Sequence, residues 1–313
     1  MLAPICLFTY NRLEETIQTV KSLQNNYLAP LSELFVFSDG PRSESAIPKV
    51  TEVRNYLSTI TGFKSVLILE SPVNKGLANS IIEGVSKVIE QYGKIIVLED
   101  DLISSPNFLN FMNHALDFYE TDTKIQSING YSVFLMSAME EVYFQTRPFP
   151  WGWATWSDRW KKDIFDKKKL DLFIKSDNFI LKEFKAKCGN DISKMLLNSI
   201  NNKNDSWYVR WTFDHFRNNN YSIFPTKSYI QNIGHNTNGT HCNGINSYVS
   251  TLINIHETDH KLSGLIIPDK KLKKEFLKYF NLSYKLKFRI KLLSTKLGRQ
   301  RLMEELRYKI NLK

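Results

Sequence analysis

The sequence predicts an α/β protein with a mostly parallel sheet flanked by helices, and three observations support this prediction. Short apolar runs alternate with the patterns of amphipathic helices up to residue 130, as in doubly wound sheets. The run 94–98 lacks the apolar/polar alternation of a half-exposed strand, which indicates a strand covered on both faces. Polar or acidic residues follow several runs, at the sheet edge where such folds bind ligands.

Each of the first four apolar runs is expected to form a strand that leads into a helix. The expected strands are 4–10, 34–38, 65–69 and 94–98, and the helices begin near residues 12, 50, 77 and 106. Further strands are expected at 125–131, 222–224 and 229–230. The lysine-rich segment 161–203 is expected to be helical, and another helix should begin after Asp205 or Ser206, either of which can act as N-cap.

Composition is typical of a folded, reduced, globular protein. Apolar residues make up 42% and charged residues 24% of the 313 residues, which excludes a largely disordered chain. The sequence starts without a basic signal-peptide region, and no apolar run approaches the ~20 residues that span a bilayer, so we expect a cytoplasmic protein. The three cysteines, Cys6, Cys188 and Cys242, are widely spaced and indicate neither a disulfide framework nor a zinc site.

The positive charge is concentrated near the C-terminus. The formal net charge is +10, whereas residues 269–313 alone carry 15 Lys or Arg against 4 Asp or Glu, a balance of +11. The near-neutral remainder argues against a nucleic-acid-binding body. From Leu282 onward, apolar residues are interspersed with Lys and Arg, a pattern compatible with a basic amphipathic helix on a membrane surface. A solvated terminal helix, or one that packs against the body, is the alternative.

Three consecutive acids end the apolar run 94–98. Glu99, Asp100 and Asp101 are therefore expected at the ligand-binding edge of the sheet. Clustered carboxylates suit Mg²⁺ or Mn²⁺, and such an ion can in turn bind a diphosphate. The alternative is an acidic loop that precedes the helix beginning near Pro106.

Other polar residues are expected at the same edge. The segment 9–12 joins the first strand to its helix, and Asp39 follows the second strand. An aspartate there can accept a hydrogen bond from a nucleobase imide or a ribose hydroxyl, although an Asp-Gly-Pro turn is sufficient reason for it. Lys75 precedes a helix N-terminus and could face a phosphate, while Gly76 could serve only to shape the turn.

An aromatic block at 149–160 contains four of the six tryptophans. Flat aromatic faces suit stacking on sugar rings, whereas plain core packing uses more Leu, Ile and Val. Core packing remains the explanation for some of these tryptophans. A later loop at 232–242 combines glycines with His235 and His241, a composition typical of mobile functional loops.

With these motifs in order, the chain resembles the nucleotide-sugar-dependent glycosyltransferases of the GT-A (Rossmann-like) fold. The resemblance covers roughly residues 3–242, and it is strongest to the N-acetylglucosaminyltransferase I type and a bacterial group of similar cytoplasmic transferases. It rests on the acids followed by Pro106-Asn107-Phe108, on Phe149-Pro150 with Gly152-Trp153, and on Asp205-Ser206-Trp207 ahead of the loop 234–241.

The resemblance implies a metal-dependent site for a nucleotide sugar. Asp101 would bind a divalent cation, Mn²⁺ or Mg²⁺, held by the donor diphosphate, while Asp100 and Glu99 would contact the ribose and the sugar. Asp39 would contact uracil. The expected donor-binding residues are Thr9, Arg12, Asp39, Lys75, Glu99, Asp100, Trp153 and His241.

The general base of the family is an Asp just before a Trp at the start of a late helix, and it matches Asp205. Ser206 stands where the family has a second Asp, so Asp158 and Asp214 remain alternatives. One base and a single displacement imply inversion at the anomeric carbon, whereas two carboxylates flanking a glycosidic bond would indicate a hydrolase. UDP-N-acetylglucosamine is the implied donor, and the implied acceptor is a glycan or lipid-linked glycan of bacterial surface polysaccharide or lipo-oligosaccharide synthesis.

Three parts of the chain are expected on this basis. Residues 1–130 would form the nucleotide-sugar-binding α/β half, residues 131–260 the acceptor-side and catalytic half of the same domain, and residues 261–313 a basic helical tail.

Two other functions share some of these features. A sugar nucleotidyltransferase would have the sheet and the metal-binding acids, but it should carry a Gly-rich loop after the first strand, and segment 9–12 contains no glycine. A non-enzymatic nucleic-acid-binding protein would agree with the pI of about 9.3 and the aromatic content. Against it, the basic excess lies in the tail.

Overall fold

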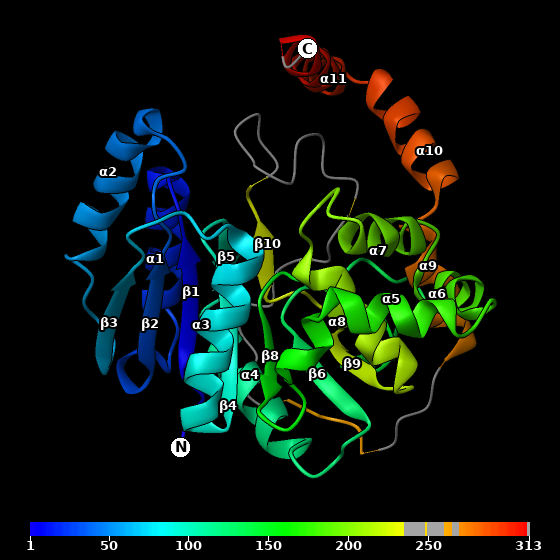
Figure 1. The fold of residues 1–313 in the computed structure, drawn as a ribbon, viewed down its shortest axis with the longest axis horizontal. Coiled ribbons are helices and arrows are strands. Elements are labelled where there is room, and N and C mark those ends of the chain that lie inside the picture. The colour runs from blue at the N-terminus through cyan, green and yellow to red at the C-terminus, as the bar shows by residue number, and fades with distance from the viewer. Residues whose placement is uncertain (235–247, 249–259, 265–268, 312–313) are drawn as a thin grey trace.

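The computed structural model describes residues 1–234, 248, 260–264 and 269–311. Its centre is an eight-stranded sheet of order β3-β2-β1-β4-β8-β6-β9-β7, and helices cover both faces of this sheet (Figure 1). The strands are β1 (Ile5–Thr9), β2 (Glu33–Ser38), β3 (Ser65–Glu70), β4 (Lys94–Glu99), β6 (Ile125–Asn129), β7 (Val142–Gln145), β8 (Trp153–Trp156) and β9 (Tyr221–Pro225).

The four N-terminal strands run parallel to one another. Ile5 pairs with Leu34 of β2 and with Ile96 of β4, and β3 joins β2 at the edge. The second half is mixed: β8 is antiparallel to β4 and β6, β9 is parallel to β6, and β7 is antiparallel to β9. Parallel pairings predominate, which confirms the predicted mostly parallel α/β sheet.

Alternate residues of the central strands point into two different apolar cores. Ile5 and Leu7 are buried with α1 (Leu13–Gln24), α2 (Ile47–Leu57) and α4 (Phe108–Phe118). Cys6 and Phe8 are buried on the other face with α3 (Leu77–Tyr92). Since helices cover both faces of the sheet, a side chain that points to either face enters an apolar core. This explains the unbroken apolar run that forms β4.

The lysine-rich segment is helical, as predicted. It forms a short 3-10 helix, η3 (Lys162–Phe165), and then α5 (Lys167–Lys175), α6 (Ile180–Cys188) and α7 (Ile192–Ile200). The following helix, α8 (Trp207–Arg217), is buried over most of its length. These helices pack on the α3 side of the sheet (Figure 1).

A small second sheet places the end of β10 close to the end of β4. β5 (Leu102–Ser104) follows the acids directly, and it pairs in antiparallel fashion with β10 (Ile230–Asn232). The backbone N–H of Ile233 then donates to the carbonyl of Asp101 at 2.9 Å. The segment after β10 therefore starts beside the acidic cluster.

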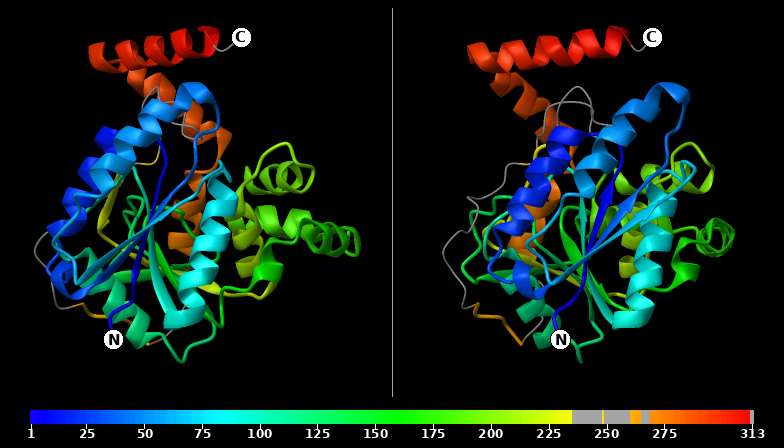
Figure 2. Two further views of the ribbon diagram at one scale, coloured as in Figure 1. Left: turned by 60° about the vertical axis from the view of Figure 1, so that its left-hand side comes forward. Right: turned by 90° about the vertical axis from the view of Figure 1, so that its left-hand side faces the viewer.

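Helix α9 (Lys270–Lys278) belongs to the core in spite of its basic sequence. Phe276, Tyr279 and Phe280 are buried in the same core as α1 and α4, and the Arg147 guanidinium lies 3.6 Å from the centre of the Phe280 ring. In contrast, α10 (Leu282–Leu293) and α11 (Lys296–Asn311) project from the body (Figures 1 and 2). No helix among the described residues is long and apolar enough to cross a membrane.

We expect Phe276→Ala to lower the free energy of unfolding by about 3–5 kcal/mol, because truncation of a buried phenylalanine leaves a cavity. Denaturant titration would measure the change. The control is Leu282→Ala on α10, where the leucine is 81% exposed and the change should stay within about 0.5 kcal/mol. Equal losses in the two variants would contradict the assignment of α9 to the core.

Candidate functional site

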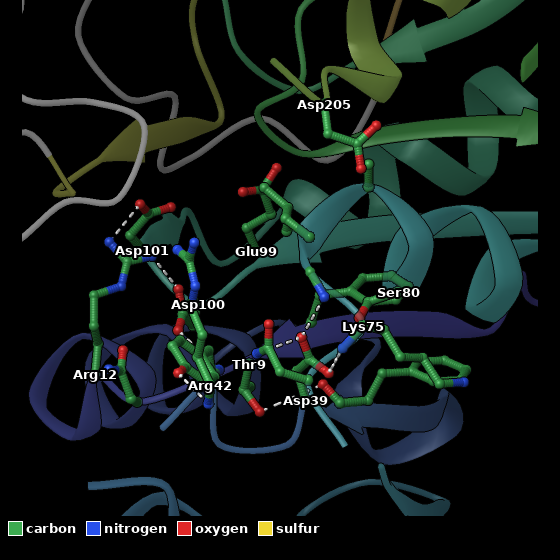
Figure 3. A pocket seen from close by; sticks show the side chains of 18 residues that line it. Thr9, Arg12, Asp39, Arg42, Lys75, Ser80, Glu99, Asp100, Asp101 and Asp205 are labelled. Atoms are coloured by element: carbon green, nitrogen blue, oxygen red, sulfur yellow. Dashed lines mark hydrogen bonds and ion pairs between the residues drawn. The ribbon is translucent and has the colours of Figure 1, made fainter. Parts of the chain in front are cut away.

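A cavity of about 400 Å³ lies at the carboxyl ends of β1, β2 and β4 (Figure 3). The parallel strands all end at this edge of the sheet. The N-terminus of α3 and Asp205, which precedes the N-cap of α8, complete the wall of the cavity. The predicted site residues that line it are Thr9, Arg12, Asp39, Lys75, Glu99, Asp100, Asp101 and Asp205. Arg42 and Ser80 also line the cavity, and the sequence reasoning missed both.

Arg12 is the countercharge of the acids at the end of β4. Its guanidinium forms one ion pair with Asp100 and a second, with an N···O distance of 3.0 Å, with Asp101. The Asp100 and Asp101 side chains are only 5% and 9% exposed. Carboxylates so poorly hydrated require a partner of opposite charge, and Arg12 provides it.

Burial raises the pKa of two of the three acids. The pKa of Glu99 rises to about 8, first because of burial and then because of the negative charges on Asp101 and Asp100. Burial also raises the pKa of Asp100, although the Arg12 guanidinium opposes this rise. Repulsion within such a cluster favours the approach of an additional cation.

Thr19 on α1 holds the backbone of the acidic segment in place. Its hydroxyl donates to the carbonyl of Asp100 at 2.9 Å and accepts from the N–H of Leu102 at 3.1 Å. Thr19 is fully buried. Nothing in the sequence marks this role, because a threonine inside an amphipathic helix is unremarkable until its distant partner is known.

Asp39 connects the end of β2 to the turn before α3. One carboxylate oxygen accepts from the N–H groups of Gly40 and Lys75, both at 2.9 Å. The other accepts from the N–H of Gly76 at 3.0 Å and from the side-chain amide of Asn74 at 3.1 Å. Since a carboxylate has about four acceptor positions, these four donors satisfy it.

The turn held by Asp39 presents the N-terminus of α3 to the cavity. Gly76 has a φ of +75°, a backbone conformation that favours glycine. Lys75 borders the cavity while its Nζ atom pairs with Glu83 at 2.6 Å. The Ser80 hydroxyl, also at the cavity wall, has no hydrogen-bond partner within the described part of the chain. Free N–H groups at a helix N-terminus favour an anionic ligand.

Asp205 faces the acidic cluster from the opposite side of the cavity (Figure 3). Its carboxylate pairs with Arg210 at 3.0 Å and Lys167 at 3.4 Å, and its side chain remains 47% exposed. The neighbouring Ser206 is the N-cap of α8 and accepts from the N–H of Val209 at 3.3 Å. A capping role accounts for serine at the position where the resembling family has a second Asp.

The two alternative acids lie elsewhere. Asp158 is exposed and pairs only loosely with Arg159, at 3.6 Å. Asp214 is buried and bonds to Gln126 and Arg217. Neither residue lines the cavity, so Asp205 is the candidate base that the geometry favours.

Trp153 does not contact the cavity, which contradicts the expectation that it binds the donor. Its side chain is fully buried in β8, with the ring centre 5.3 Å from that of Trp160 and 4.5 Å from that of Trp211. Trp151, Trp156 and Trp160 are also buried. The aromatic block therefore packs in the protein core, and it offers no open ring face for a sugar.

The predicted contact from His241 lies outside the described residues, as does the whole of segment 235–247. The residue directly before this segment is nevertheless anchored at the site. Gly234 packs so tightly on Asp101 that an added Cβ atom would lie 1.9 Å from a carboxylate oxygen of Asp101. Only glycine permits this close approach.

The cluster fits a divalent cation that is shared with a ligand. Among the described residues, no group of three or more His, Cys, Asp or Glu side chains could hold a metal ion by itself. Mg²⁺-type sites commonly use one or two carboxylates together with substrate phosphate oxygens. Asp101 supplies such a carboxylate to the cavity that the N-terminus of α3 also lines.

The first part of the chain matches a known family. Residues 5–186, more than half of the chain, match the family model described as Glycosyl transferase family 2. No curated protein matches the chain.

Solved structures also match the chain, and they include a mannosyltransferase and TarS. A mannosyltransferase, PcManGT from Pyrobaculum calidifontis, in complex with GDP-Man and Mn²⁺, is 8% identical, with a TM-score of 0.35 over 50% of this chain and 46% of that chain. TarS 1–349 from S. aureus is 12% identical, with a TM-score of 0.40 over 75% of this chain and 61% of that chain. The chain thus spans about half of the first protein and three fifths of the second.

We expect Asp39→Asn to lower the free energy of unfolding by about 1–3 kcal/mol, because an amide NH₂ would face two donors that are now bonded to a carboxylate oxygen. Denaturant titration would measure this loss. Asp117→Asn is the control: its side chain is 65% exposed and pairs with Lys94, so the change should be below about 1 kcal/mol. A loss at Asp39 no larger than that at Asp117 would refute the anchoring role.

Proposed function

The chain belongs to glycosyl transferase family 2, and on that premise we propose that it transfers N-acetylglucosamine from UDP-N-acetylglucosamine to a glycan hydroxyl, with inversion at the anomeric carbon. The main support for this proposal is that a single cavity is lined both by the acids at the end of β4 and by Asp205. Sugar transfer requires positive charge near the leaving diphosphate and a carboxylate near the acceptor hydroxyl. The resemblance to the N-acetylglucosaminyltransferase I type is the reason for proposing this donor sugar.

In this proposal, Asp101 would hold a Mn²⁺ or Mg²⁺ ion that serves the diphosphate end of the donor. A bound cation of this kind supplies the charge that stabilises the departing UDP. Lys75 and the N-terminus of α3 border the same space and would add positive potential there. Asp100 and Glu99 are assigned to the ribose and the sugar, and Thr9 and Arg12 to the nucleotide.

Asp39 is assigned to the uracil end of the donor. Its four hydrogen bonds leave no acceptor position open, so a uracil imide N–H would have to replace one of the present donors. The Asn74 side chain is the donor that can move most freely, because the other three are backbone groups. Uracil binding would therefore release Asn74 from the Asp39 carboxylate.

Asp205 is assigned the role of general base. The acceptor oxygen attacks the anomeric carbon, the bond from this carbon to the diphosphate oxygen breaks, and Asp205 takes the acceptor proton. Arg210 and Lys167 orient the Asp205 carboxylate, and its partial exposure leaves access for an acceptor. Because one displacement occurs without a covalent intermediate on the protein, the anomeric configuration is inverted.

We place this reaction in the cytoplasm, in bacterial surface polysaccharide or lipo-oligosaccharide synthesis, with peripheral membrane contact through the basic tail. The acceptor is a glycan or a lipid-linked glycan. A sugar nucleotidyltransferase is the second candidate, and the glycine-free segment 9–12 together with the family match favours the transferase.

We expect calorimetry with a panel of nucleotide sugars to show Mn²⁺-dependent binding of UDP-N-acetylglucosamine. Asp101→Asn should weaken this binding roughly tenfold or more, because the metal loses its carboxylate. Asp117→Asn, an exposed and distant acid, is the matched control and should bind like the wild type. If the folded wild type binds no nucleotide sugar with or without the metal, the donor assignment is wrong.

Replacing the proposed base by Asp205→Asn should reduce kcat by about 10²–10⁴-fold, the usual contribution of a general base. Donor binding should stay close to that of the wild type. UDP release with an acceptor that the wild type uses would measure the rate. Asp158→Asn is the control, since this acid is exposed and lies outside the cavity; an equal loss of rate in both variants would exclude Asp205 as the base.

A further inference from the structure

Helix α10 carries an exposed row of large apolar side chains. Leu282, Leu286, Ile290 and Leu293 are 81%, 58%, 58% and 54% exposed. Their spacing of four, four and three residues places them on one face of the helix. No residue of α10 is buried, so packing against the body does not explain the row. Contiguous apolar surface of this kind marks an interaction site.

The two helices that flank α10 in the sequence, α9 and α11, already make contacts of their own. Helix α9 fills its own place in the core through Phe276. Helix α11 holds another side of α10, where Arg289 pairs with Glu305 at 2.6 Å. Figure 1 shows both α10 and α11 outside the body, and α11 also lies beyond it in the two views of Figure 2. The apolar row therefore faces a partner other than the described part of this chain.

The charge around the row indicates the chemistry of this partner. Residues 282–293 contain four Lys or Arg and no Asp or Glu. Lys285 and Arg289 flank the row on one side, and Lys287 and Lys291 flank it on the other, at 100° per residue. Such a face repels a second copy of itself, and a soluble polyanion would leave the leucines in water. An anionic lipid surface satisfies both the cations and the apolar row.

The position of the two helices relative to the cavity is also informative. The strands of the parallel half start near the N-terminus. Helix α11 lies beyond the opposite end of the molecule in all three views, and α10 leads from the body to it (Figures 1 and 2). That end holds the carboxyl termini of β1, β2 and β4, which line the cavity. A surface bound by α10 would therefore lie on the cavity side of the protein.

We propose that α10 and α11 dock the protein on an anionic lipid surface through the apolar row and its flanking cations. The docking itself does not depend on the enzymatic reaction. Its consequence for the acceptor rests on the proposed function: a transferase docked in this orientation takes a lipid-linked glycan presented at the same surface.

Vesicle flotation of the full chain tests the proposal without donor or acceptor. We expect binding to phosphatidylcholine vesicles that contain phosphatidylglycerol, little binding to phosphatidylcholine alone, and loss of binding with added salt. The combined variant Leu286→Gln, Ile290→Gln and Leu293→Gln should weaken binding at least about tenfold. Leu172→Gln, at a leucine 69% exposed on α5, is the apolar control.

A second set of variants separates the charge from the apolar contribution. Lys287→Gln, Lys291→Gln and Lys296→Gln together should weaken binding at least about tenfold. The matched control removes the same charge from the body, at three exposed lysines without an ion pair among the described contacts: Lys161→Gln, Lys168→Gln and Lys169→Gln.

Four outcomes would overturn the docking proposal. These are equal binding to neutral and anionic vesicles, no binding to either, equal loss in the tail and control variants, and a dimer in sedimentation that the apolar variant dissociates. A fifth outcome would also contradict the proposal: retention of vesicle binding by the apolar variant would show that the binding is purely electrostatic. Because no nucleotide sugar is present, failure of the proposed transferase activity would leave these results unchanged.

Discussion

The pairing of Arg12 with the two aspartates after β4 is the interaction on which the site depends. β4 is buried on both faces and ends in three adjacent acids, whose mutual repulsion in a poorly hydrated place must be offset. Arg12 offsets it from the turn between β1 and α1, and Thr19 on α1 holds the backbone of the same acids. The carboxylates of the cluster are thereby assembled and oriented by contacts within the protein.

Asp39 holds the other half of the cavity in place, as Arg12 holds the acids after β4. Its carboxylate joins the end of β2 to the turn that opens α3 through four hydrogen bonds. Asp39 directly follows β2, and Arg12 lies in the turn between β1 and α1. At both places the backbone leaves the sheet and its direction is otherwise weakly determined. The charged side chains of Arg12 and Asp39 hold these two turns in place. A ligand in this cavity would meet a wall whose shape Arg12 and Asp39 maintain.

The aromatic block shows why residue type alone is a poor guide to ligand binding. Trp153 pairs with Val97 of β4 and Asn129 of β6 because β8 is inserted between these strands. A residue in the middle of a covered sheet has no access to solvent, so its ring packs against Trp160 and Trp211 from the helical side. This insertion joins strands that are distant in sequence, and the local pattern of 149–160 carries no information about it.

The sequence by itself determined the order of strands and helices in the first half and the position of the acids at the end of β4. These features follow from local hydrophobic periodicity and from the rule that parallel strands end at one edge. The tertiary structure decided which of three aspartates reaches the cavity and which donors Asp39 binds. It also decided that basic α9 packs into the core through Phe276 whereas basic α10 is exposed. Those outcomes depend on contacts between residues far apart along the chain. Local periodicity cannot encode such contacts, because they exist only after the elements have packed.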